Sequence, residues 1–491
     1  LLGGLLFGFS PHMLGHMQAG HLSLITMLGF PLFTLFLLRL LRRPTWQRTA
    51  ATGLSAFLAA AHPSYLAYFI LPTALITLGA SRSRLRNRKV CTAVLTAALL
   101  AIAMLAPFYV PLLTSHEAIT TRSLELGDSV GKSIDIASLL TPPSDNPFLP
   151  AALQPFAARV VTSTDENHGY LGWVALGLAV FGVVTRRRAI AHWTALAGGT
   201  LLLSLGPVLK FAGHLPALRI DGIAHTVQLP YSLLAQLPLF GWSRTPARFG
   251  ATAHFALAIL ATYGLAALLT RLHNRNRAAL LVGALCLTAF AERMITWPMP
   301  VAPATSSATL RTAVTPNSQR AVLNLPPSFT SNILALYAQT LHEKPILGGQ
   351  IFRGDPKTEQ SLQFLNALLR PPTDADIIPH QDRAARAAIL AAYEVGTIVN
   401  QHWAESYDPA QRDFLITEFG TPAATSEINS IFLLEDYAKS LPDLTFALHQ
   451  SDWGTPELWG NLQTRWFADT ARLYIYSAYA QTGRMRITTI P

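Results

Sequence analysis

The sequence predicts an α-helical polytopic membrane bundle followed by an extracytoplasmic α/β domain and a C-terminal β module. Of the 491 residues, 51% are hydrophobic and only 13% are charged, whereas about a quarter of the residues in soluble domains are charged. Several apolar runs approach the roughly 20 residues that span a bilayer. Basic residues gather beside these runs, as they do in membrane proteins. The net charge of +10 is therefore attributed to membrane topology, and no nucleic-acid partner is expected.

The membrane domain is expected to cover residues 1–298, with about nine spans or part-spans. Its apolar segments lie at about 1–10, 22–41, 49–79, 90–107, 170–185, 189–205, 248–270 and 278–296. His62, Pro63 and Ser64 interrupt the third segment, and because proline breaks a helix we expect two short helices there. The first run is too short to span a bilayer, so we expect it to end a helix that begins before residue 1.

Four basic clusters indicate the topology. They comprise Arg39, Arg42, Arg43 and Arg48; Arg82, Arg84, Arg86, Arg88 and Lys89; Arg186, Arg187 and Arg188; and Arg271, Arg275 and Arg277. Threading the spans alternately puts all four on one face, which the positive-inside rule makes cytoplasmic. The loops 108–169 and 206–247 and the chain beyond residue 298 are then extracytoplasmic.

The last third of the chain has the pattern of a soluble α/β domain, expected over residues 299–450. Residues 320–326 predict a strand, 331–343 a helix, and 384–403 a helix followed by a strand. Residues 451–491 alternate between polar and apolar types, which predicts the start of a β-rich module. We expect the chain to stop there within a β-hairpin.

The first candidate site is the histidine-rich stretch 9–24, between two apolar runs. His12 and His16 are four residues apart, so on a helix they would share a face. They could bind a metal, contact a substrate, or cap a membrane hairpin. No H-E-x-x-H pattern accompanies them, and the two cysteines, in apolar segments, offer no zinc site. A polar hairpin that faces the substrate is therefore preferred to a metal site, with His21 and His62 on the same outer side.

The second candidate site is the stretch STDENHGYLGW at 163–173, just before an apolar segment. Glu166 or His168 could act there as a general base or as a metal ligand, with Tyr170 in contact with the substrate. The alternative is that the acidic residues only complement a helix N-terminus.

The third candidate site is WSRTPARF at 242–249, where Arg244 and Arg248 precede the apolar segment 248–270. Arginine on the outer face runs against the positive-inside bias, so it requires a local reason. A guanidinium binds phosphate through a bidentate fork, which suggests a lipid-linked phosphate. Contact with lipid headgroups is the alternative.

These motifs together resemble a family of bacterial multi-pass membrane proteins. The residues that carry the likeness are FSPHMLGHMQAGHLSLITMLGFPL, HPSYLAYF, ENHGYLGWVALGLAVFG, LLSLGP, LPLFGWSRTPARF and YAQTLHEKPILGG. They are similar to proteins identified as glycosyltransferases of the GT-C superfamily. The resemblance implies a bundle of membrane helices in a bacterial cytoplasmic membrane and an extracytoplasmic C-terminal domain. It also implies sugar transfer from a polyprenyl-phosphate donor. The catalytic carboxylates of that superfamily lie in a loop that would precede Leu1, so none is carried over to this chain.

The sequence therefore predicts a glycosyltransferase that uses a polyprenyl-phosphate-linked sugar and a glycan, lipid or protein acceptor. Two alternatives stay open, a transporter of lipid-linked glycans and a non-catalytic membrane scaffold of envelope glycan assembly. No metal ligand is assigned, and a divalent metal stays open as a cofactor. The catalytic candidates are Glu166 and His168, and the substrate-binding candidates are His12, His16, His21, His62, Tyr170, Arg244 and Arg248.

Overall fold

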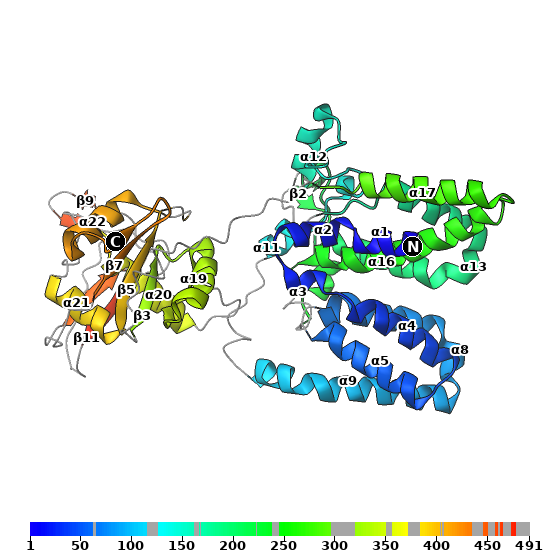
Figure 1. Ribbon diagram of the computed structural model, residues 1–491, viewed down its shortest axis with the longest axis horizontal. Helices are drawn as coiled ribbons and strands as arrows, with labels where there is room; N and C mark the ends of the chain where they lie inside the picture. Colours follow the sequence, from blue (N-terminus) through cyan, green and yellow to red (C-terminus); the bar gives the residue numbers. More distant parts are fainter. Residues whose placement is uncertain are drawn as a thin grey trace. The chain divides into compact units, whose positions relative to one another are not determined.

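The computed structural model divides the chain into two compact units, Leu1–Val301 and Ala302–Pro491 (Figure 1). The predicted boundary, at 298/299, lies three residues from this division. The structure describes residues 1–61, 65–114, 126–161, 166, 168–221, 223–237, 245–295, 320–349, 356–371, 383–402, 404, 407–434, 445–449, 457–459, 462–464 and 473–477.

In the part of the chain that the structure describes, unit 1 consists of helices and one β-hairpin. The helices up to the first long loop are α1 (Leu2–Gly8), α2 (Pro11–Gln18), α3 (Leu22–Ile25), α4 (Gly29–Arg42), α5 (Trp46–Ala60), the π-helix η1 (Leu66–Ile70), α7 (Leu71–Ala80), α8 (Arg82–Leu85) and α9 (Arg88–Thr114). The later elements are α11 (Leu126–Gly131), η2 (Ile136–Leu139), η3 (Ala151–Leu153), α12 (Gln154–Val160), α13 (Trp173–Ser204), β1 (Ala217–Ile220), β2 (Ile223–Thr226), α14 (Tyr231–Leu234), η4 (Pro246–Arg248), α16 (Phe249–Leu269) and α17 (Arg275–Ala291).

Most apolar segments form helices where the sequence predicts them, and one does not. The break in 49–79 is confirmed, because α5 ends at Ala60 and the next helix begins at Leu66. The single helix predicted over 22–41 is wrong, since the chain forms the short α3 and then α4. Pro31 explains the restart: it has no N–H to donate, so it fits the first turn of α4 and not a helix interior.

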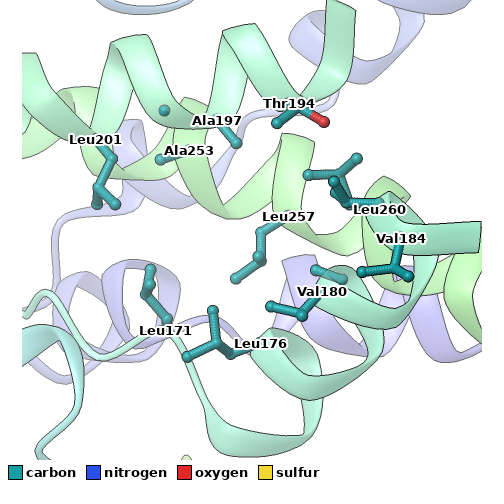
Figure 2. Close-up of a pocket in the computed structure, with 13 residues that line it drawn as sticks. Leu171, Leu176, Val180, Val184, Thr194, Ala197, Leu201, Ala253, Leu257 and Leu260 are labelled. Carbon is teal, nitrogen blue, oxygen red and sulfur yellow. The ribbon is translucent and has the colours of Figure 1, made fainter. Parts of the chain in front are cut away.

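Helix α13 folds back on itself at the third basic cluster. Arg186 has non-helical φ and ψ of −127° and 24°. Leu176 and Leu201 would be about 37 Å apart on a straight helix, yet both line one apolar pocket of about 290 Å³ (Figure 2). The two halves of α13 are therefore the two separate helices predicted at 170–185 and 189–205.

The first half of α13 packs closely against α16 through facing glycines. A Cβ on Gly264 would lie 1.9 Å from the carbonyl oxygen of Leu178, and one on Gly182 would lie 2.8 Å from that of Leu260. Only glycine allows backbones to approach this closely, as at helix interfaces in membranes.

The four basic clusters lie at one end of unit 1. In Figure 1 the α4–α5 turn, α8, the bend of α13 and the α16–α17 turn are all at the right-hand end, and α2 and α3 lie at the other. The chain itself supports this arrangement, because the 21 residues of α16 separate Arg248 from Arg271 by about 30 Å.

Among the described residues, two helices are long and apolar enough to cross a membrane, Arg88–Pro111 and Pro246–Leu269. Unit 1 is thus mostly helical with two candidate spans, which is coarser than the predicted nine-span bundle.

Unit 2 contains a mixed five-stranded sheet in the order β4-β3-β5-β7-β6. Its strands are β3 (Ala321–Leu325), β4 (Ile346–Leu347), β5 (Val395–Gln401), β6 (Ala424–Thr425) and β7 (Asn429–Leu433), and its helices are α19 (Phe329–His342), α20 (Pro356–Leu368), α21 (Arg383–Ala392) and α22 (Pro409–Phe419). Strands β3, β4 and β5 are parallel, and β7 is antiparallel to β5. The strand and helix predicted at 320–343, and the helix and strand at 384–403, are confirmed.

Two further strand pairs follow the sheet of unit 2. Strand β8 (Thr445–His449) pairs with β11 (Leu473–Ser477), and β9 (Glu457–Trp459) pairs with β10 (Leu462–Thr464), both antiparallel. The β8–β11 pair crosses the predicted boundary at 450/451.

Candidate functional site

The three histidines of the first candidate site form one cluster. Ser10 precedes α2 with extended backbone and Pro11 occupies its first position, so α2 begins there and puts His12 and His16 on one face. Their ring centroids are 4.3 Å apart. His21 lies just after the turn that ends α2, and its Nδ1 is 3.1 Å from Nδ1 of His16. His16 is fully buried and His21 is half-buried.

Glu166 joins this cluster from the second candidate site. Its Oε2 lies 3.8 Å from Nε2 of His16, an ion-pair distance. Its two carboxylate oxygens accept hydrogen bonds from Arg248, at 3.3 Å from Nε and 2.5 Å from Nη2. Such a bidentate pair is stronger and more directional than a single hydrogen bond. Glu166 was predicted as a base and Arg248 as a phosphate-binding residue. The structure shows that these two side chains form an ion pair with each other.

Buried contacts from the π-helix η1 position Arg248. The hydroxyl of Tyr68, in η1, accepts a hydrogen bond of 3.1 Å from the backbone N–H of Thr245. The Thr252 hydroxyl donates to the carbonyl oxygen of Tyr68 at 2.8 Å. Residues 245–252 include the 3₁₀ turn η4 and the start of α16, so Tyr68 fixes the segment that carries Arg248. Irregular helical turns of this kind occur often at functional sites.

His12 is buried, as are His16 and His168. Burial lowers its pKa well below the usual value of 6.5, and the charges of His16 and Arg248 lower it further. Among the described residues, Nε2 of His12 has no hydrogen-bond partner. His12 is therefore a neutral imidazole inside the cluster.

His168 and Tyr170 divide between two places. His168 is buried and contributes to the electrostatic environment of His12, so it belongs to the cluster. The side chain of Tyr170 points elsewhere, with its hydroxyl 3.4 Å from Oε2 of Glu292. Its carbonyl oxygen is 3.0 Å from Nε2 of His254, a residue of α16. The backbone of Tyr170 thus contacts His254, a residue that acts electrostatically on His12, and the predicted substrate contact of the Tyr170 side chain has no support from this placement.

The structure brings in a charged pair that the sequence reading missed. Glu292 follows α17 and accepts hydrogen bonds from the backbone N–H groups of Trp173 and Val174, at 3.0 Å and 3.3 Å, so it caps the N-terminus of α13. Arg293 is buried and donates to the carbonyl oxygen of Leu171 at 2.5 Å. The sequence carried a signal, because two adjacent charges interrupt the apolar segment 278–296.

Two predicted residues, His62 and Arg244, lie outside the described residues. Within the part of the chain that the structure describes, no group of three or more His, Cys, Asp or Glu side chains is arranged to hold a metal ion. The cluster (His12, His16, His21, Glu166, His168 and Arg248) is instead a chain of imidazoles that ends on a carboxylate–guanidinium pair. Chemically it can exchange protons and present positive charge.

Comparison with known proteins adds no family assignment. A scan against models of protein families gives no match, and a search of curated proteins gives none either.

Proposed function

We propose that the chain is a membrane glycosyltransferase that transfers a sugar from a polyprenyl-phosphate donor on the extracytoplasmic side of a bacterial cytoplasmic membrane. One observation carries the proposal: the titratable cluster lies at the end of unit 1 opposite the four basic clusters. By the positive-inside rule the basic end is cytoplasmic, so the cluster would face the compartment in which lipid-linked sugars are used.

The exposed surface of unit 1 supports a membrane location. The apolar window of α9 is only 22% buried within the unit, and Leu99 and Ile102 on this helix are more than 60% exposed. Val184 on α13 and Leu287 on α17 are exposed to a similar degree. Soluble monomers rarely expose contiguous apolar surface of this kind, whereas a hydrocarbon core covers it at no cost. We therefore propose that further helices of unit 1 cross the membrane beside the two candidate spans.

The chemistry of the cluster suits an inverting sugar transfer. Such a reaction requires a base that takes the proton of the acceptor hydroxyl and positive charge that stabilises the departing phosphate. Imidazoles provide the first, since they change protonation near neutral pH. Arg248 provides positive charge, part of which Glu166 neutralises, and Arg244 lies four residues earlier in the sequence. The resemblance to GT-C glycosyltransferases supports the same reaction class.

The test is transfer of labelled sugar by the protein in native membranes or proteoliposomes. Polyprenyl-phosphate donors with radiolabelled hexose or pentose are supplied, and the label in non-donor product is measured for the wild type and for Arg248→Ala. Arg277→Ala, an exposed arginine at the opposite end, is the matched control. We expect transfer by the wild type and the control and a loss of at least tenfold for Arg248→Ala. Movement of intact donor across the bilayer without transfer would instead indicate a transporter, and neither activity would indicate a scaffold.

A further inference from the structure

The cluster contains a continuous line of polar contacts. It runs from Nδ1 of His21 to Nδ1 of His16 at 3.1 Å, and from Nε2 of His16 to the carboxylate of Glu166 at 3.8 Å. Arg248 holds the far side of that carboxylate. Each imidazole therefore uses a defined nitrogen toward each neighbour, and this determines where the protons lie.

The tautomers follow from the acceptor at one end. Glu166 is a carboxylate held by a guanidinium, and its Oε2 lies 3.8 Å from Nε2 of His16, an electrostatic contact longer than a hydrogen bond. Its negative charge favours the tautomer of His16 that has the proton on the nitrogen facing it, Nε2. In neutral His16 the other nitrogen, Nδ1, is then an acceptor. The only group able to donate across the 3.1 Å contact is Nδ1–H of His21. The lone pair of His21 consequently lies on Nε2.

We propose that Nε2 of His21 is the general base of the sugar transfer, and that His16 and Glu166 are positioning residues that set its tautomer. This proposal rests on the proposed function. His21 is the half-buried member of the line and His16 is fully buried, so an acceptor hydroxyl can approach His21 more readily. Glu166, the base expected from the sequence, is already engaged by Arg248 on both oxygens.

The step balances without any further reactant. The acceptor oxygen attacks the anomeric carbon of the donor, and the bond from that carbon to the phosphate oxygen breaks, with its electron pair leaving on the polyprenyl phosphate. The proton of the acceptor hydroxyl passes to Nε2 of His21, and the proton on Nδ1 of His21 passes to Nδ1 of His16. Positive charge then lies on His16, beside the carboxylate of Glu166, and the extra proton later returns to solvent by the same route.

The surroundings favour this assignment over the other histidines. The groups that act on His12 are His16 on the same helix, Arg248 in η4, His254 in α16 and His168 in the loop before α13. Burial and these basic neighbours oppose protonation of His12, whereas His16 has the only carboxylate of the described cluster within ion-pair distance. A proton taken up by the cluster is therefore best accommodated on His16.

The first test needs no sugar donor. In ¹⁵N-histidine-labelled protein in bilayers, nitrogen chemical shifts distinguish protonated from unprotonated ring nitrogens. The signals of His16 and His21 are assigned by their loss from the spectra of His16→Asn and His21→Asn. We expect His21 as the Nδ1–H tautomer and His16 as the Nε2–H tautomer, and loss of both fixed tautomers in Glu166→Gln. His21 found as the Nε2–H tautomer in the wild type would overturn the proposal, whether or not the protein transfers sugar.

The second test measures transfer directly. We expect His21→Ala to lower the transfer rate by about 10²–10⁴-fold, and added imidazole to restore part of it, because a free base replaces the missing one. His273→Ala, an exposed histidine in the α16–α17 turn, is the matched control and should keep the wild-type rate. An inactive wild type would count against the proposed function, whereas an active wild type with an unaffected or imidazole-insensitive His21→Ala would overturn the assignment of the base.

Discussion

Replacing Glu166 by glutamine tests the electrostatic role of this residue in the transfer reaction. When the cluster takes up a proton, positive charge on His16 lies 3.8 Å from Oε2 of Glu166. At an effective dielectric constant of about 20, a charge pair at that distance is worth about 4 kcal/mol. Loss of this stabilisation corresponds to a rate decrease of up to about 10³-fold. Solvent near the partly exposed carboxylate weakens the interaction, so we expect about 10²-fold to 10³-fold.

The same substitution also removes the partner of Arg248, whose side chain is 17% exposed. A largely buried charge without its partner destabilises the fold, so a rate loss alone would be ambiguous. In the double variant Glu166→Gln with Arg248→Met that charge is absent, and its melting temperature should recover toward the wild-type value.

The assay measures both the melting temperature and the rate of labelled-sugar transfer for the wild type, Glu166→Gln, Arg248→Met and the double variant. We expect stability to recover in the double variant, which shows how much of the loss of stability comes from the unpaired charge of Arg248. Because the double variant also lacks Arg248, its rate should stay as low as that of Arg248→Met. The electrostatic role is tested on Glu166→Gln itself, as the rate per folded protein well below its melting temperature, and a rate within threefold of wild type would refute it.

Two further predictions concern packing and pH. Gly264→Ala should destabilise unit 1 by several kcal/mol, because its Cβ would lie 1.9 Å from the Leu178 carbonyl oxygen and overpacking forces the backbone to move. A Cβ on Gly283 would have no atom within 4 Å, so Gly283→Ala should be neutral or stabilise the unit by up to about 1 kcal/mol. Urea or thermal melts of the two variants measure the difference. Equal effects of the two substitutions would contradict the close α13–α16 packing. Burial and the charge of His16 lower the folded-state pKa of His12 below its usual value of 6.5. The unfolded chain therefore takes up a proton at a higher pH than the folded chain does. As a result, the stability of the fold falls as the pH drops below 6.5, by up to about 1.4 kcal/mol per pH unit. Melting temperatures between pH 7 and 5 should therefore fall less steeply in His12→Gln than in the wild type, and parallel curves would show that His12 is not buried as a neutral group.

Helix positions followed from the sequence wherever apolar length and helix breakers agreed. The break after Ala60 and the turn at Arg186 were both predicted, because proline and a run of arginines each oppose a continuous apolar helix. The start of a new helix at Gly29 was not predicted. Pro31 is compatible either with a long apolar run or with the first turn of a new helix. Only the packed structure decides between these positions.

The members of the site followed from the sequence, but their pairing did not. Residue type and topology placed His16, Glu166 and Arg248 on one side of the helical unit. That Arg248 holds Glu166 depends on the approach of two segments about 80 residues apart in the chain. The hydrogen bond from the backbone of Thr245 to the hydroxyl of Tyr68 could not be predicted either. The sequence around a tyrosine in an apolar helix does not identify its hydrogen-bond partner.

The measurement that bears most directly on the proposed function is sugar transfer by the purified protein in sealed proteoliposomes. Labelled polyprenyl-phosphate sugar is placed in the lipid, and the release of polyprenyl phosphate and the gain of label by an added membrane acceptor fraction are followed together. The proposal predicts equal release and gain with the wild type, and a decrease of at least 10²-fold in both with His21→Ala. Intact donor with no label in any acceptor, in vesicles that contain correctly folded protein, would contradict it.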